Sequence, residues 1–132
     1  MNLHQIILDA KLGSARKDAQ IDTCTVFAAA LYDLLPEQGI VCKMVAVEKR
    51  GLGAWAHSVV EVDGRYYDSM GEFSVDIYRT RAKIHPKVEL DIQFRPDSRH
   101  DCFESDFDEM YTFYVKMLSK SLYGQAAAPV AA

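Results

Sequence analysis

The sequence predicts a single α+β domain, and three observations lead to that prediction. Apolar residues recur at helical spacing towards both ends of the chain, whereas the middle holds short runs rich in β-branched residues. The pair Asp63-Gly64, which is typical of a tight hairpin, lies between two of these runs. The chain of 132 residues is long enough to bury one core. We therefore expect helices packed against one small antiparallel sheet.

Two helices are predicted in the N-terminal part of the chain. Residues 3–10 carry apolar side chains at helical spacing after Asn2, which can cap the helix N-terminus. A polar stretch follows, and a second apolar stripe runs from Phe27 to Leu35 before a proline ends it. Cys24 therefore lies in the first turn of the second helix.

The middle of the chain predicts three strands, a short helix and a further strand. Residues 40–49 have β-branched and apolar side chains without helical period, as in a largely buried strand. Residues 55–62 and 65–70 flank the Asp-Gly pair and predict the two arms of a hairpin. Residues 73–84 are compatible with a short helix, and the alternation in residues 87–94 predicts a half-buried strand.

The C-terminal part predicts a helix that completes the core. Apolar residues return to helical spacing from Ser105 to Leu122. The last segment, GQAAAPVAA, has nothing to pack against, and we expect it to be disordered. The predicted organisation is one domain over residues 1–123 and a disordered tail over residues 124–132.

Composition and charge exclude several classes of function. Hydrophobic residues make up 49% of the chain and charged residues 26%, as in ordinary soluble domains. The formal net charge is -4 and no run of lysines or arginines occurs, so we expect neither nucleic acid nor a membrane as a partner. The N-terminus lacks the pattern of a signal peptide, and we expect a cytoplasmic protein. The sequence indicates no oligomeric state.

The hairpin predicts that a histidine and an aspartate lie close together. Counting outward from the Asp-Gly turn puts Val59 opposite Asp68, and His57 lies two residues further along the same strand. Side chains alternate between the two faces of a sheet, so His57 and Asp68 project from one face as diagonal neighbours. A carboxylate in that position can fix the imidazole tautomer and favour its protonated form.

Cys24 fits this pair as a nucleophile. A thiol in the first turn of a helix lies near the positive end of the helix dipole and near unpaired N–H groups, which lower its pKa. A neighbouring imidazolium lowers the pKa further. The order Cys24, His57, Asp68 therefore suits nucleophilic catalysis by a thiolate, with the backbone N–H of Cys24 as an oxyanion donor.

Two stretches of the sequence resemble a known family. TCTVFAAALYDLLPEQGIVCKMVAV, followed by HSVVEVDGRYYDSMG, is similar to the core of the transglutaminase-like superfamily, a branch of the papain-like cysteine enzymes. The resemblance covers about residues 22–71. It implies a papain-like fold with the nucleophile helix packed on the sheet, and the roles of nucleophile for Cys24, general base for His57 and orienting acid for Asp68. Gln20 lies near the position of the papain-type oxyanion glutamine and is a second candidate donor.

The resemblance also implies a class of reaction. It indicates a protease, amidase, deamidase or transglutaminase acting on a protein, peptide or amide substrate without a cofactor, and the sequence does not choose among these activities. Trp55 and Tyr66 are candidates for the substrate pocket, although Trp55 equally suits the core. The alternative is a catalytically inactive copy of the fold that serves as a binding or assembly module. Chemistry like that of arylamine acetyltransferases is a third possibility that the short chain disfavours.

The remaining cysteines and histidines predict no metal site. Three cysteines without a CxxC pattern do not make a disulfide framework, so we expect free thiols. Cys42 lies in an apolar strand and is expected in the core, whereas Cys102 is expected at the surface or in packing. The spacing of His85, His100 and Cys102 matches no standard zinc pattern.

Overall fold

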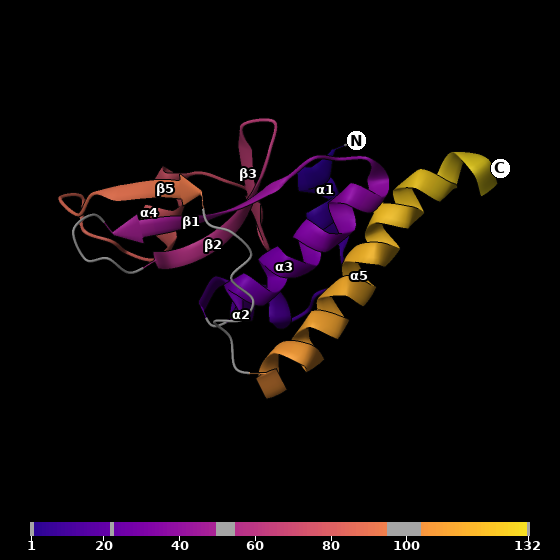
Figure 1. Ribbon diagram of the computed structural model, residues 1–132, viewed down its shortest axis with the longest axis horizontal. Helices are drawn as coiled ribbons and strands as arrows, with labels where there is room; N and C mark the ends of the chain where they lie inside the picture. Colours follow the sequence, from indigo (N-terminus) through magenta and orange to yellow (C-terminus); the bar gives the residue numbers. More distant parts are fainter. Residues whose placement is uncertain (1, 22, 50–54, 95–103, 132) are drawn as a thin grey trace.

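The computed structural model describes residues 2–21, 23–49, 55–94 and 104–131. The helices are α1 (Leu3–Asp9), α2 (Ala15–Ile21), α3 (Cys24–Leu34), the 3₁₀ helix η1 (Leu35–Gln38), α4 (Val75–Arg81) and α5 (Glu104–Ala131). The strands are β1 (Lys43–Lys49), β2 (Trp55–Val62), β3 (Arg65–Asp68), β4 (Gly71–Phe73) and β5 (Leu90–Phe94). Within these ranges the fold is α+β, and α3 lies between the sheet and the long helix α5 (Figure 1).

The strands form one antiparallel sheet in the order β4-β3-β2-β1-β5. The predicted hairpin between β2 and β3 is confirmed, with Val62 paired to Arg65. Asp63 and Gly64 have φ angles of 50° and 79°, the left-handed conformation that a type I′ turn requires at both positions. The sequence did not predict β4, because a three-residue strand is too short to show an alternating pattern.

The two predicted N-terminal helices are confirmed as α1 and α3, but α2 between them was not predicted. Asn2 caps α1 by accepting a hydrogen bond from the backbone N–H of Gln5 at 3.1 Å. α2 lies in the polar stretch between the two predicted helices. Its buried side chains include Ala15 and Ala19, one turn apart. Alanines give a weak hydrophobic pattern, which explains why this helix was missed.

The predicted C-terminal helix is confirmed and is longer than expected. Tyr114, Leu118 and Leu122 form its buried stripe, and the helix packs against α3 and α1. The structure continues α5 to Ala131, through residues that the sequence analysis expected to be disordered. The three consecutive alanines in this segment have the highest helix propensity of all residues, which favours the continuation.

The two faces of the sheet carry separate hydrophobic clusters. Met44 and Val60 belong to the larger cluster, with side chains of α1, α3 and α5. Val45 and Val59, one residue along each strand, belong to a smaller cluster with Tyr78 of α4. α3 and α4 therefore lie against opposite faces of the sheet. None of the helices in the described ranges combines the length and the apolarity that crossing a bilayer requires.

Candidate active site

His57 and Asp68 lie side by side in the hairpin, as the register of β2 and β3 predicts. The Nε2 atom of His57 donates to Oδ2 of Asp68 at 3.0 Å. Both residues are buried, with exposed fractions of 0% and 1%. A hydrogen bond between such fully buried groups fixes both the ring orientation and the tautomer.

Asp68 is held by two further groups. Its Oδ1 accepts from the backbone N–H of Met70 at 2.9 Å, and its Oδ2 accepts from Arg81 at 3.2 Å. Burial by itself would raise the pKa of Asp68. The hydrogen bond and charge of His57, the Met70 N–H and the charge of Arg81 outweigh burial and lower the pKa below its ordinary value. Asp68 is therefore ionised at neutral pH.

The imidazole of His57 is enclosed by aromatic rings. Tyr78 stacks on it with ring centroids 5.0 Å apart and planes inclined by 8°, and Phe73 lies 5.5 Å away. Burial opposes the charged imidazolium, but Asp68 and the Cys24 thiol together raise the pKa of His57 to about 9. Its Nδ1 is a buried polar atom with no hydrogen-bond partner among the described residues.

Cys24 begins α3 and is 6% exposed. Burial by itself would raise the pKa of its thiol. The adjacent His57 imidazole, the backbone N–H of Ser58 and the hydroxyl of Thr25 outweigh burial and lower that pKa. Because Asp68 occupies Nε2 of the ring, Nδ1 is the ring atom left to exchange a proton with the thiol.

The first turn of α3 has no side-chain N-cap, and hydrogen bonds of the Thr23 and Thr25 side chains hold it in place. The Thr23 side chain makes no capping hydrogen bond, because its hydroxyl is bonded to the hydroxyl of Tyr114 at 2.7 Å. Thr25 shares a hydrogen bond of 3.1 Å with Ser58 of β2, next to His57. The helix start is thus tied to the histidine strand, while its N–H groups receive no cap from Thr23 and are suited to stabilise an oxyanion.

The other candidates from the sequence have different positions. Gln20 on α2 donates through Nε2 to Ser69 at 2.8 Å and accepts through Oε1 from Arg81 at 3.1 Å, so its amide is engaged in the network around Asp68. Tyr66 packs against the smaller hydrophobic cluster. Trp55 begins β2, and its side chain lies outside what the structure describes.

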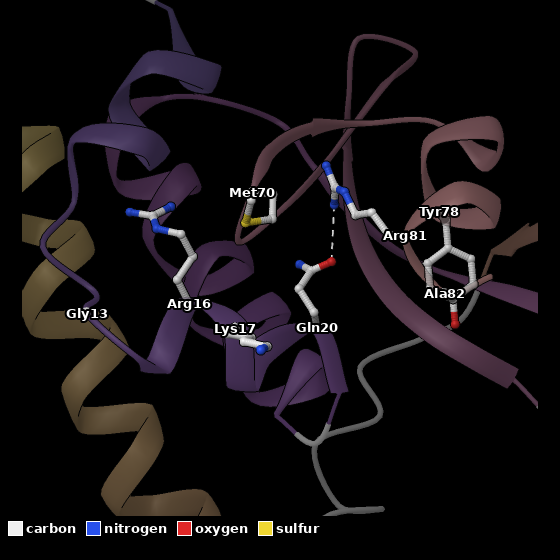
Figure 2. A pocket seen from close by; sticks show the side chains of 8 residues that line it. All are labelled: Gly13, Arg16, Lys17, Gln20, Met70, Tyr78, Arg81 and Ala82. Carbon is white, nitrogen blue, oxygen red and sulfur yellow. Dashed lines mark hydrogen bonds between the residues drawn. The ribbon is translucent and has the colours of Figure 1, made fainter.

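A cavity of about 490 Å³ adjoins the residues that surround His57 and Asp68. It is lined by residues of α2, of α4 and of the turn between β3 and β4, together with Gly13 before α2 and Ala82 after α4 (Figure 2). Gln20, Tyr78 and Arg81 belong both to its lining and to the surroundings of His57 and Asp68. Tyr78 and Arg81 were not predictable from the sequence, since a tyrosine and an arginine in a short helix give no distinguishing pattern.

The other thiols and histidines of the described ranges are not among the groups that contact Cys24, His57 or Asp68. Cys42 is half-buried against the larger cluster, with its sulfur 3.6 Å from the carbonyl oxygen of Tyr32. The predictions for His100 and Cys102 lie outside the described residues. Within the part of the chain that is described, no three His, Cys, Asp or Glu residues form a group that could hold a metal ion.

In comparisons with known proteins, no protein-family model, no curated protein and no solved structure matches this chain significantly.

Proposed function

We propose that this protein is a transglutaminase-like cysteine enzyme that transfers or hydrolyses the acyl group of a carboxamide or peptide substrate. One observation carries the proposal. The thiol of Cys24, at the start of a buried helix, adjoins an imidazole whose other nitrogen is bonded to Asp68 at 3.0 Å. This is the arrangement that activates a thiol as a nucleophile and orients its base.

The arrangement of elements supports the same proposal. The nucleophile helix packs on an antiparallel sheet, and the base and the orienting carboxylate come from neighbouring strands of that sheet. This is the arrangement that the resemblance of residues 22–71 to the transglutaminase-like and papain-like enzymes implies.

The first half of the reaction forms a thioester. Nδ1 of His57 takes the proton of the Cys24 thiol, and the thiolate sulfur bonds to the substrate carbonyl carbon. The negative charge moves to the carbonyl oxygen, where first-turn N–H groups of α3 stabilise it. When the tetrahedral intermediate collapses, the C–N bond breaks and the leaving amine takes the proton from His57.

The second half releases the acyl group. His57 removes a proton from the incoming nucleophile, which attacks the thioester carbonyl. The C–S bond then breaks, and His57 returns the proton to the sulfur to restore the thiol. Water as the nucleophile gives hydrolysis of a peptide or deamidation of a glutamine side chain, whereas an amine gives transamidation. Asp68 keeps the ring oriented through both halves.

The test is the rate of iodoacetamide alkylation as a function of pH, with mass spectrometry to locate each modified thiol. We expect Cys24 to react faster than the half-buried Cys42 near neutral pH, because a thiolate is the reacting species. His57→Gln and His57→Ala should abolish the advantage of Cys24 over Cys42, while circular dichroism of both variants stays that of the native fold.

An inert Cys24, or one that titrates like a free thiol of pKa about 8.5 in the native chain and the variants alike, would contradict the proposal. The alternative of an inactive binding or assembly module would then take its place.

A further inference from the structure

The cavity beside the candidate active site is positively charged, although the chain as a whole carries a formal charge of -4. Three of its lining residues are the cations Arg16, Lys17 and Arg81, and none of the described residues that line it is an aspartate or glutamate. A cavity with one sign of charge and partly apolar walls concentrates ligands of the opposite sign. The lining therefore favours an anionic ligand.

The three cations differ in how far the protein neutralises them. Arg16 donates to the backbone carbonyls of Leu8, Ala10 and Ser69, which satisfy its hydrogen bonds but bring no negative charge. Arg81 is paired with the carboxylate of Asp68.

The side chain of Lys17 is exposed, and its ammonium makes no hydrogen bond or ion pair with any described residue. Figure 2 shows its side chain beside Gln20, across the cavity from Tyr78. Its ammonium is thus free to meet a ligand.

The position of the cavity connects it to the reaction. Tyr78 lines the cavity and stacks on the His57 ring at 5.0 Å, and Arg81 reaches from the cavity to Asp68 at 3.2 Å. A group bound there would lie one side chain away from the imidazole. Met70 and Ala82 add apolar surface to the lining, so the cavity can hold an apolar segment as well as a charge.

We propose that this cavity binds a carboxylate carried by the acyl substrate, with Lys17 as its main charged contact. The inference rests on the proposed function, because the carboxylate is the anion that peptide substrates carry. Its source is either a free C-terminus close to the scissile bond or the side chain of an aspartate or glutamate.

Binding is tested without relying on the thiol, by titrating the ¹⁵N-labelled native chain and following amide chemical shifts. The probes are N-acetyl-alanyl-alanine, which has a C-terminal carboxylate, N-acetyl-glutamic acid α-amide, which has a side-chain carboxylate, and the neutral N-acetyl-alanyl-alanine amide. We expect at least one carboxylate probe to shift the amides of residues 16–20 and 78–82 more strongly than the neutral probe does. The probe that binds more tightly identifies the source of the carboxylate.

Matched variants locate the charge that is responsible. Lys17→Gln should weaken binding of the carboxylate probe by roughly two- to fivefold, the range for a solvent-exposed ion pair. Lys116→Gln, on the exposed side of α5 and outside the cavity lining, should leave binding unchanged. Equal binding of neutral and carboxylate probes, or equal weakening by the two variants, would overturn the inference.

A second readout separates this inference from the proposed function. Relative to a free thiol, Cys24 should prefer iodoacetate over iodoacetamide, and Lys17→Gln should reduce that preference. Carboxylate binding by a chain whose Cys24 is inert would support the proposed carboxylate site and contradict the proposed enzymatic function. If Cys24 is reactive but neither experiment shows a preference for carboxylates, the proposed carboxylate site is overturned and the proposed enzymatic function is not.

Discussion

At the scale of single residues, the carboxylate of Asp68 accepts hydrogen bonds from two basic side chains. Its Oδ2 accepts from His57 at 3.0 Å and from Arg81 at 3.2 Å. When the thiol of Cys24 passes its proton to His57, two negative and two positive groups balance, and the net charge of the group does not change. Proton transfer inside the site therefore avoids the large cost of burying an unpaired charge.

The titration of this pair predicts how stability depends on pH. The pKa of His57 is raised from 6.5 to about 9, so its contribution to the unfolding free energy is complete below pH 6.5 and is lost as pH rises through 9. The pKa of Cys24 is lowered from 9.0, so its contribution is present above pH 9 and is lost as pH falls through the folded-state pKa. Where both groups titrate, the two slopes have opposite signs and offset each other.

Replacing the thiol should leave the pH dependence of the unfolding free energy that comes from His57 alone. In Cys24→Ala, the bond to Asp68 still raises the pKa of His57, and the unfolding free energy should fall as pH rises from 6.5 towards 9. Urea denaturation at a series of pH values measures this slope. The double variant Cys24→Ala/His57→Gln is the control and should lack it; equal slopes in the two variants would refute the assignment of the raised pKa to His57.

At the scale of elements, Tyr114 joins α5 to the two helices that approach the site. Its hydroxyl donates to the carbonyl of Ala15 at 2.8 Å and is bonded to the hydroxyl of Thr23 at 2.7 Å. Tyr114→Phe leaves both partners in a buried region, and we expect a loss of about 1 to 3 kcal/mol in unfolding free energy. Because Thr23 precedes Cys24, the variant should also slow the alkylation of Cys24.

Tyr123→Phe on the exposed side of the same helix is the matched control and should change neither stability nor reactivity. Retention of native stability in Tyr114→Phe would show that the two hydrogen bonds do not hold α5 in place.

The start of β4 depends on a glycine for two reasons. Gly71 has a φ of 91°, and a Cβ atom there would lie 2.3 Å from Nδ1 of His4 on α1. That nitrogen accepts from the backbone N–H of Glu72 at 2.8 Å, so α1 and β4 are joined at this point. Gly71→Ala should lower the unfolding free energy by about 1 to 3 kcal/mol through backbone strain, in addition to the steric clash.

Thermal denaturation measures this effect, with two comparisons. Gly124→Ala is the control, because a Cβ there meets nothing within 4 Å and the position is helical. It should be neutral or stabilising. His4→Ala/Gly71→Ala should recover the part of the loss that comes from the clash. A Gly71→Ala variant as stable as the native chain would contradict the geometry of this junction.

The elements differ in how far the sequence could predict them. The helix from Cys24 and the hairpin around Asp63-Gly64 were predictable because a long apolar stripe and a turn signal are local properties of the chain. α2 and β4 were not, because two buried alanines and a three-residue strand acquire their environment only from neighbouring elements. The same reason applies to Arg81, whose partner Asp68 lies on another element.

At the scale of the whole molecule, the hairpin predicted the juxtaposition of His57 and Asp68 because both residues lie on one local structure. The approach of Cys24 to His57 was a hypothesis that rested on the order of the residues and on the resemblance to a family, since it depends on how α3 docks on the sheet. The cavity and its charge were beyond reach, because they arise from α2, α4 and a turn that meet only in the folded chain.

The packing of α3 between the sheet and α5 predicts that helices and sheet unfold together. Leu31 is fully buried in the larger cluster, and Leu31→Ala should lower the unfolding free energy by about 2 to 5 kcal/mol. The fluorescence of Trp55, the single tryptophan, reports on β2, whereas far-ultraviolet circular dichroism reports mainly on the helices. Both signals should shift by the same amount in urea.

Leu8→Ala, at a position 40% exposed on α1, should move neither transition by more than about 0.5 kcal/mol. Separate transitions for fluorescence and circular dichroism in the native chain would mean that helices and sheet fold as two units. A shift of the circular dichroism signal alone in Leu31→Ala would mean that α3 does not stabilise the strand that carries His57. A common shift of both signals would tie the stability of the nucleophile helix to that of the histidine strand, as a site assembled from the two requires.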